Sequence, residues 1–521
     1  MTYLSSYLQE LMSMRSCFLL AVALLLSFSS IAQNCAIRGQ AKGYEGRKLA
    51  VVALADELSE KRLLLAQCDV SDSGTFAIDF DPQVTRRVYL HIQRVEAPIY
   101  VEPGKKYEVV FPALDKAEYK RFDNTEVNLT LLGLDNDDLN LQIRKFNADF
   151  ADFIAQHFYD FATQEYKGSS AYLKYLGDKK SKVDLYRSAN GQDSLQQTGA
   201  SNFGNLVSQF ADSILHNKAA TENDFLQDYK RFSIAELFLL SGMSRKLFYE
   251  NYLMSIVPPL HNPAFASCFK LFAQNLLTGQ KANVQSALIK AVNVDRDLVR
   301  LGEALSFESE LKSSRLKQLA AICGLKEVYN NKSYDRSAID FLLSHVASQD
   351  SLIDEVAESM LFQLSKCRMG WNMPEVVFTD EAQDKWHLSD NQGQPVYLLF
   401  FATWSPSSLK EILVLERAKE KFNGRIRFVA VCMDDDYRNY RKYIEEHMKM
   451  PIPIVYGNAD PFVHEKFNLK SIPHQVMIDA NSRVAADVCP PPSDAQFESF
   501  LNRIALPVNP NSQAPKTWRN H

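Results

Sequence analysis

The sequence contains few cysteines, and they are spaced far apart. Eight cysteines are spread over 521 residues, and no two form a Cys-x-x-Cys arrangement. That spacing excludes the usual structural zinc sites, which need closely spaced pairs of ligands. It also leaves no adjacent pair of thiols for redox chemistry. An isolated cysteine inside an apolar run, such as Cys323, is explained more simply as a small buried side chain.

Other functional signatures are absent as well. The chain has 58 Lys and Arg against 63 Asp and Glu, a net charge of -5, with no basic run or basic-aromatic stripe, so we expect no nucleic-acid partner. No H-E-x-x-H, G-x-S-x-G or phosphate-loop motif occurs, so we expect no metal and no cofactor. A chain of 521 residues with 46% hydrophobic residues is too long for one ordinary core, which predicts two to four domains.

Residues 1–33 have the pattern of a signal peptide. Arg15 precedes an apolar core at residues 17–26, and small residues follow at 27–32. The core is too short to anchor the chain in a bilayer. We therefore expect a protein of the periplasm or cell envelope. Lipid modification of Cys35 stays open as an alternative, although the residues before it form a poor lipobox, and a membrane partner is expected only in that case.

Two further domains are predicted before residue 370. Residues 35–115 contain short apolar or alternating runs separated by turn residues, which predicts a small antiparallel β domain, a β-sandwich. Residues 125–368 are helical by pattern, with an aromatic stripe from Phe146 to Phe161 that is more typical of a bundle core than of a ligand site. His157 in this stripe is likewise expected to be a core residue. A ligand receptor built around this helical region remains an alternative.

Residues 371–506 change to alternating strands and helices, which predicts a sheet with helices on both faces. The region opens with a buried strand and a helix over residues 397–422, and a strand is also expected at 483–488. A capping box at Ser493 and Gln496 predicts the start of the last helix. The polar residues 507–521 are expected to be a disordered tail.

Four segments of this region resemble the TlpA/ResA-type thiol-disulfide oxidoreductases of the thioredoxin fold, over about residues 373–505. The matching segments are residues 373–380, 401–406, 431–434 and 471–479. The resemblance implies a C-terminal α/β thioredoxin-like domain; together with the patterns before residue 370, the sequence predicts a multidomain α+β chain with an N-terminal β-sandwich and a helical middle region. It also implies a cis peptide bond before Pro473, facing the redox position.

The chain departs from this family at the residues that carry the chemistry. The family has cysteines where this sequence has Ser405 and Ser408, and a serine hydroxyl forms neither a thiolate near neutral pH nor a disulfide. Leu399 stands where classical thioredoxins place a buried acid. We therefore expect no redox catalysis at this site, and Ser405 serves instead as a helix N-cap before Pro406. A nucleophilic Ser405 would need His474 as its base and a third group that nothing in the sequence identifies.

Two functional hypotheses follow. The first is a non-catalytic binding or scaffolding protein that holds an unknown protein or peptide at the cis-proline groove. The groove residues are Trp404, Ile472, Pro473 and His474. The alternative is a thiol-disulfide oxidoreductase or antioxidant-type enzyme that acts through a non-standard cysteine.

Cys432 and Cys489 are the cysteines considered for that alternative. The strand order of the family places their strands about 14 Å apart. A disulfide needs Cα atoms within about 7 Å, so the two should not pair.

Overall fold

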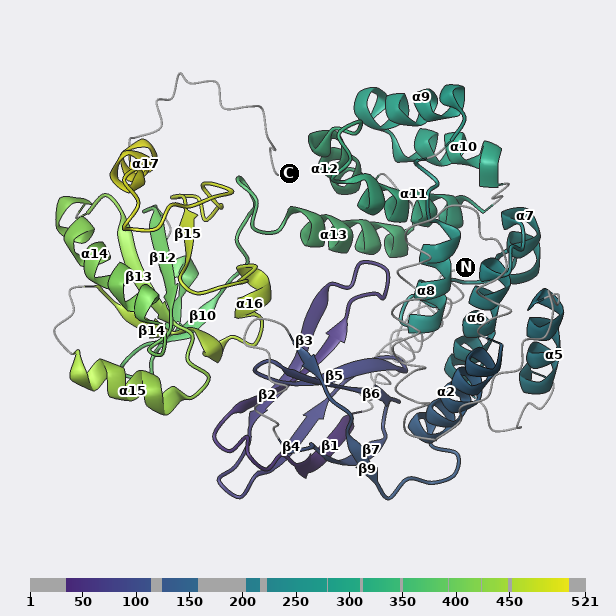
Figure 1. Cartoon of the computed structure of the whole chain (residues 1–521), viewed down its shortest axis with the longest axis horizontal. Helices are drawn as coiled ribbons and strands as arrows, with labels where there is room; N and C mark the ends of the chain where they lie inside the picture. The colour runs from purple at the N-terminus through teal and green to yellow at the C-terminus, as the bar shows by residue number, and fades with distance from the viewer. Residues whose placement is uncertain are drawn as a thin grey trace, which may run out of the picture.

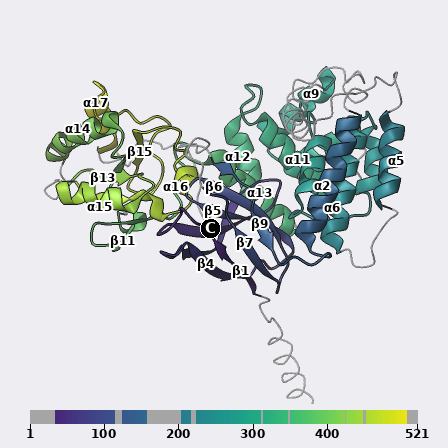
Figure 2. The ribbon, with the colours of Figure 1, turned by 60° about the horizontal axis from the view of Figure 1, so that its bottom comes forward.

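A computed structural model describes most of the chain. The described residues are 34–113, 124–157, 203–215, 223–278, 280–309, 313–346, 350–391, 393–422, 424–447 and 452–505. The signal peptide, the C-terminal tail and the end of the aromatic stripe lie outside these ranges and stay predictions. Figure 1 shows a β domain beside a group of helices, with an α/β domain on the other side, and Figure 2 shows the same three parts from another direction. The expected multidomain architecture is confirmed.

The N-terminal domain is a sandwich of two sheets. One sheet has the order β4 (Thr75–Phe80), β1 (Cys35–Gln40), β7 (Lys106–Val110), β9 (Thr130–Leu132). The other has the order β3 (Arg62–Asp69), β2 (Lys48–Leu54), β5 (Arg86–Ile92), β6 (Val95–Val101), β8 (Thr125–Glu126). Ile37, Val51 and Val88 from the two sheets meet in one buried core, as alternation along the strands dictates.

Two features of the sandwich differ from the sequence-based expectation. The pairs β1–β7 and β6–β8 run parallel, so the domain is not purely antiparallel. The strands β8 and β9 lie beyond residue 115, and both sheets therefore extend past the expected boundary. Neither strand has a strong apolar pattern of its own, because each is a short edge strand held by its neighbour.

The middle of the chain is helical. Its helices are α2 (Leu139–Gln156), α5 (Phe203–Leu215), α6 (Asp224–Leu240), α7 (Arg245–Phe248), η1 (Tyr249–Leu253), α8 (Pro263–Phe272), α9 (Ala282–Lys290), η2 (Ala291–Asp295), α10 (Leu298–Ser309), α11 (Ser314–Val328), α12 (Arg336–Ser344) and α13 (Ser351–Ser365). Phe146 and Phe153 of the aromatic stripe are buried against α5 and α6, which confirms for the described residues that the stripe is core. His157 is partly exposed and caps the end of α2, so it is not the core residue that was expected. Within the described ranges, no helix has the length and apolar character needed to cross a membrane.

The C-terminal domain is built on one six-stranded sheet. Its order is β11 (Lys385–His387), β10 (Val377–Thr379), β14 (Ile454–Tyr456), β13 (Arg427–Cys432), β12 (Val396–Phe401), β15 (His474–Ile478). One face is covered by α14 (Pro406–Phe422), α15 (Tyr437–Glu446) and α17 (Phe497–Ala505), and the other by α16 (Val463–Lys466) and the segment around Trp371. Two short 3-10 helices, η3 (Leu388–Asn391) and η4 (Gly457–Ala459), complete the domain. Helices on both faces were predicted correctly.

Two local predictions in this domain are wrong. The expected strand at 483–488 is reduced to isolated bridges at Arg483 and Val484. Ser493 does not cap α17, because its amide and hydroxyl both bond to the carboxylate of Glu411 on α14. That contact removes Ser493 from the capping box, and α17 begins only at Phe497.

The sandwich and the C-terminal domain are in direct contact. Arg62 of β3 pairs with Glu96 inside the sandwich and lies 3.4 Å from Glu465 at α16. Gln93, in the turn between β5 and β6, donates a hydrogen bond to the carbonyl of Asp435. Asp435 lies three residues after the end of β13, in the loop next to the degenerate redox position, so the sandwich contacts that loop.

Candidate functional site

The site lies where β12 ends and α14 begins. All six residues of β12 are buried, as expected for an unbroken apolar strand in the middle of a sheet. The chain then turns over residues 402–405, and α14 starts at Pro406, which is favoured as a first helical residue. The strand-turn-helix unit predicted from the sequence is confirmed.

Ser408 occupies the second degenerate position and is fully buried. Its Oγ lies 2.8 Å from the carbonyl oxygen of Ser405 and 3.1 Å from that of Ala402, and it accepts a hydrogen bond from the Ala402 amide at 3.3 Å. The hydroxyl therefore ties the end of the strand to the first turn of the helix. A buried hydroxyl satisfied in this way has a structural role and is not presented to a substrate.

Ser405, the first degenerate position, is 6% exposed. Its carbonyl accepts the amides of Ser408 and Leu409, as the residue before a helix should, while its Oγ lies 3.2 Å from the Ser407 hydroxyl. The N-cap position is confirmed, but the bond from the Oγ is to a neighbouring side chain and not to a backbone amide. Among the described residues, no hydrogen bond joins Ser405 to His474, the base that a nucleophilic serine would need.

The cis-proline feature implied by the resemblance is present. The Ile472–Pro473 peptide bond is cis. The antiparallel register pairs Phe400 of β12 with His474 of β15, and continuing it by two residues places Ile472 opposite Ala402. Ile472 and Pro473 are both partly exposed and lie beside the start of the degenerate turn.

His474 faces inward more than its position suggested. Burial lowers the pKa of its imidazole, while a hydrogen bond with the Phe467 backbone acts in the opposite direction. Its ring packs near Phe400, with centroids 6.1 Å apart. The ring is thus held between the Phe467 backbone and Phe400, and no hydrogen bond brings it to the Ser405 hydroxyl in the described structure.

Trp404 lies on the other side of the turn. Its side chain is 41% exposed and lines a cleft of about 490 Å³ between α14 and α15, together with Leu413 and Tyr443. Ile472, Pro473 and His474 do not line this cleft. The sequence-predicted binding residues therefore divide into two neighbouring surfaces, with Trp404 on the helical side and the other three at the edge strand.

Asp434 is a site residue that the sequence reasoning did not single out. It is fully buried, its carboxylate accepts a hydrogen bond from the Thr403 amide at 2.9 Å, and it is also bonded to the Thr403 hydroxyl. Burial raises the pKa of Asp434, and the bonds to Thr403 oppose that shift. A signal existed: Asp434 and Thr403 each follow one of two parallel strands, β13 and β12, and such ends meet at one edge of a sheet.

The cysteines provide no thiolate near this site. Burial raises the pKa of all seven described cysteines, including Cys489 to about 12 and Cys432 well above its usual value. Each of the seven is free, so Cys432 and Cys489 are unpaired, as predicted. Cys367 donates to the Lys466 carbonyl at 2.9 Å, and its pKa rises to about 11.

Comparison with known proteins agrees with this geometry. The family model described as thioredoxin-like matches residues 393–484, which span β12, the degenerate turn and the cis-proline. The C-terminal domain is thioredoxin-like. The thiol-disulfide oxidoreductase ResA of Bacillus cereus is 23% identical to this chain over 141 residues, covering 27% of this chain and 80% of ResA. ResA of Bacillus anthracis matches with the same identity and coverage.

Solved structures resemble the same share of the chain. The thioredoxin domain of a thiol-disulfide oxidoreductase from Bacteroides vulgatus is 19% identical, covers 26% of this chain and 97% of its own, and has a TM-score of 0.23. A thiol:disulfide interchange protein from Chlorobium tepidum is 21% identical with 26% and 97% coverage and a TM-score of 0.24. Each match therefore covers about a quarter of the chain. The thioredoxin-like domain keeps its strand, turn, helix and cis-proline, and it has serine at both positions where the resemblance places the redox cysteines.

Proposed function

We propose that this chain is an exported, non-catalytic binding protein of the cell envelope, which holds an extended peptide or protein segment at the cis-proline groove. The observation that carries the proposal is Ser408. At a position where an enzyme of this family needs a thiol, a fully buried hydroxyl bonds to the backbone of Ala402 and Ser405. The fold is kept and the reactive group is replaced by a structural one.

The edge of the sheet supports peptide binding. β15 is the last strand of the sheet, and residues His474, Gln475 and Val476 at its start are all partly exposed. No hydrogen bond to the Ile472 amide occurs among the described residues. An extended peptide could pair with this free backbone, as peptides do when they add to a sheet edge. Apolar side chains of the peptide would then contact Ile472 and Pro473.

The competing enzyme hypothesis needs a thiolate elsewhere. Cys432 ends β13, and burial followed by the charge of Asp434 raises the pKa of its thiol. Burial also raises the pKa of Cys489, which lies beside the Tyr397 hydroxyl. Thiolate fractions at neutral pH are then very small, and thiol-disulfide exchange needs the thiolate. This chemistry favours the binding protein over the enzyme.

Site-specific photo-crosslinking tests the proposal in the cells that make the protein. A photo-reactive side chain is placed at Ile472 in the groove and, as a control, at the exposed Asn481 beyond the far end of β15. We expect a discrete adduct from position 472 and none from position 481. Two variants distinguish the cleft lined by Trp404 from the edge of β15. The adduct of a peptide paired with β15 should be lost with Gln475→Pro and kept with Trp404→Ala. Equal adducts at positions 472 and 481, or none at 472, would contradict the proposal.

A further inference from the structure

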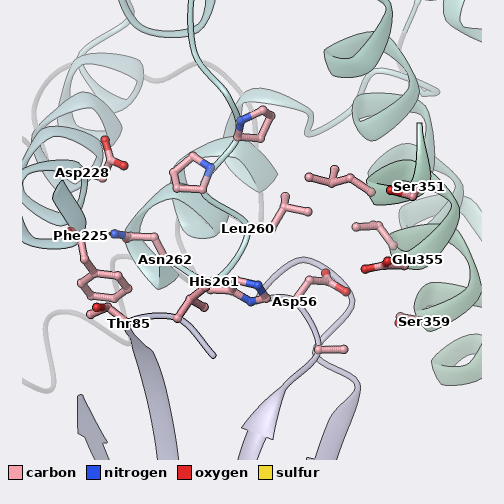
Figure 3. A pocket seen from close by; sticks show the side chains of 16 residues that line it. Asp56, Thr85, Phe225, Asp228, Leu260, His261, Asn262, Ser351, Glu355 and Ser359 are labelled. Carbon is pink, nitrogen blue, oxygen red and sulfur yellow. Dashed lines mark hydrogen bonds between the residues drawn. The ribbon is translucent and has the colours of Figure 1, made fainter. Parts of the chain in front are cut away.

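A cavity of about 370 Å³ lies far from the thioredoxin-like site, where the sandwich meets the helices. Its walls come from the loop after β2, the start of β5, α6, the loop before α8, and α13. Figure 3 shows side chains from these elements converging on one space, with His261 and Leu260 near its centre. A junction of domains with convergent polar groups is a common place for a small ligand, and the volume is at the lower end of the roughly 300–1,000 Å³ of such sites.

The charge of the lining is negative. Asp56, Asp228 and Glu355 line the cavity, and no Lys or Arg is among the lining residues. His261 does not compensate them, because burial and the nearby Arg86 lower the pKa of its imidazole to about 4. The Arg86 guanidinium lies 2.9 Å from His261 Nδ1 and also donates to the Leu54 carbonyl, outside the lining.

The three carboxylates are not equivalent. Asp56 is occupied, because it accepts hydrogen bonds from the amides of Leu58 and Ser59 and from the Ser59 hydroxyl. Asp228 is partly exposed and Glu355 is exposed, and neither accepts a hydrogen bond from any other described residue. In Figure 3 they stand on opposite sides of the cavity, Asp228 on α6 and Glu355 on α13. Burial raises the pKa of Asp228, although Arg231 acts in the opposite direction. A positively charged ligand would therefore stabilise the ionised form of the Asp228 carboxylate.

Ser359 adds an independent sign of a missing partner. Its side chain is 4% exposed, it lines the cavity from α13, and it has no hydrogen-bond partner in the described part of the chain. The hydroxyl oxygen is not among the fully enclosed atoms that lack a partner, so it is accessible at the cavity wall although the residue as a whole is buried. A polar ligand in the cavity would supply that partner.

We propose that this cavity binds a small organic amine, of about the size of an amino sugar, with its ammonium group held by Asp228 or Glu355 and a hydroxyl bonded to Ser359. An organic cation fits better than a metal ion, since the described residues contain no group of three or more His, Cys, Asp or Glu placed to hold a metal. The site is separate from the cis-proline groove and does not depend on the proposed peptide binding.

Calorimetric titration of the purified full chain with matched probes tests the proposal. Glucosamine is compared with glucose, and putrescine with 1,4-butanediol, so that in each pair ammonium groups are replaced by neutral hydroxyls of similar size. We expect the amines to bind and the neutral analogues to bind at least tenfold more weakly, because a hydrogen bond to a charged group is the dominant contact. Equal binding within a pair, or no binding of either amine, would overturn the assignment.

Variants locate the binding. Asp228→Asn and Glu355→Gln should each weaken the binding of the amines, and at least one of the two variants should weaken it by about tenfold. Glu358→Gln is the matched control, since Glu355 and Glu358 are both exposed on the same helix and only Glu355 lines the cavity. Ser359→Ala should weaken the binding of glucosamine but leave the binding of putrescine unchanged, because putrescine has no hydroxyl. If Glu358→Gln lowered the affinity for the amines as much as Glu355→Gln does, the attraction would come from the overall negative charge of the surface, which would contradict the site. Near-ultraviolet circular dichroism confirms that each variant is folded.

Discussion

The Asp434 carboxylate accepts the Thr403 amide at 2.9 Å, and this bond joins the ends of two neighbouring parallel strands beside the degenerate redox turn. The adjacent carbonyls are also held in place: Asn458 donates to the Asp434 carbonyl at 3.0 Å, and Gln93 of the sandwich donates to that of Asp435. The turn with serine at both degenerate positions therefore has a buried acid beside it as a structural anchor. The sandwich contacts the same loop, so residues from two domains hold the segment 434–435.

Removing this anchor should destabilise the C-terminal domain. Asp434→Ala leaves the amide and hydroxyl of Thr403 without their partner, and we expect a loss of about 1–3 kcal/mol in the free energy of unfolding. Tryptophan fluorescence during urea denaturation measures it, because the four tryptophans, at 371, 386, 404 and 518, all lie in or beyond this domain. The exposed Asp390 provides the control variant, Asp390→Ala. A loss no larger than that of the control would contradict the anchor role.

The ionisation of Asp434 predicts a pH effect. Its folded-state pKa is raised by burial, so the folded protein holds the proton more tightly than the unfolded chain does. The stabilisation of the folded protein by the protonated Asp434 is complete at acid pH. It is lost as the pH rises from about 4 through the raised pKa. The stability of the native chain relative to Asp434→Asn should therefore fall as the pH rises from about 4 through the raised pKa. A difference that stays constant with pH would contradict a raised pKa.

The two serines should differ in their effect on stability. Ser408→Ala removes a fully buried hydroxyl that bonds to the backbone, and we expect a loss of about 1 kcal/mol. Ser405→Ala should cost less than the usual loss of about 1 kcal/mol for an N-cap, because the Ser405 Oγ bonds to Ser407 and not to a helix amide. The same fluorescence assay compares them. The reverse order would mean that Ser405 caps the helix through its side chain.

Part of this site could be predicted from the sequence. The strand, turn and helix over residues 397–422 follow from local pattern alone, because a buried apolar run and an N-cap are signals within a few residues of each other. The cis bond at Pro473 came from the resemblance. Asp434 and Thr403 could not be joined without the strand order, since they are 31 positions apart.

Contacts between residues still further apart in the sequence could not be predicted from it. Ser493 bonds to Glu411, 82 positions away, and not within its predicted capping box, and no local pattern encodes that contact. The cavity of His261 and Ser359 is assembled from segments between residues 55 and 359, each unremarkable by itself. Such sites depend on packing between domains, and packing was not predictable here.

The Arg62–Glu96 pair inside the sandwich predicts acid sensitivity. Burial alone would raise the pKa of Glu96, but hydrogen bonds with His91 and Arg62 lower it to about 2. A lowered pKa contributes stability above the usual value near 4.3, and this is lost as the pH falls towards 2. Arg62→Gln leaves Glu96 with one partner fewer, and we expect a loss of about 2–3 kcal/mol at pH 7 that shrinks at pH 3.

Scanning calorimetry at the two pH values measures this change. Lys48→Gln is the control within the same sandwich, because Lys48 pairs with Asp69 at 3.2 Å on the exposed surface. Exposed pairs contribute little, so this variant should melt close to the native chain. If the two variants lowered the melting temperature equally, the buried pair would have no special role.

Insulin reduction tests the central claim most directly. We measure turnover with dithiothreitol for the native chain, for Ser405→Cys, and for Ser405→Cys combined with Ser408→Cys. The native chain and the single variant should show background rates, and the double variant should gain turnover, because a helix N-terminus favours the thiolate. Native turnover that disappears with Cys432→Ala or Cys489→Ala would contradict the account and establish an enzyme with a non-standard cysteine.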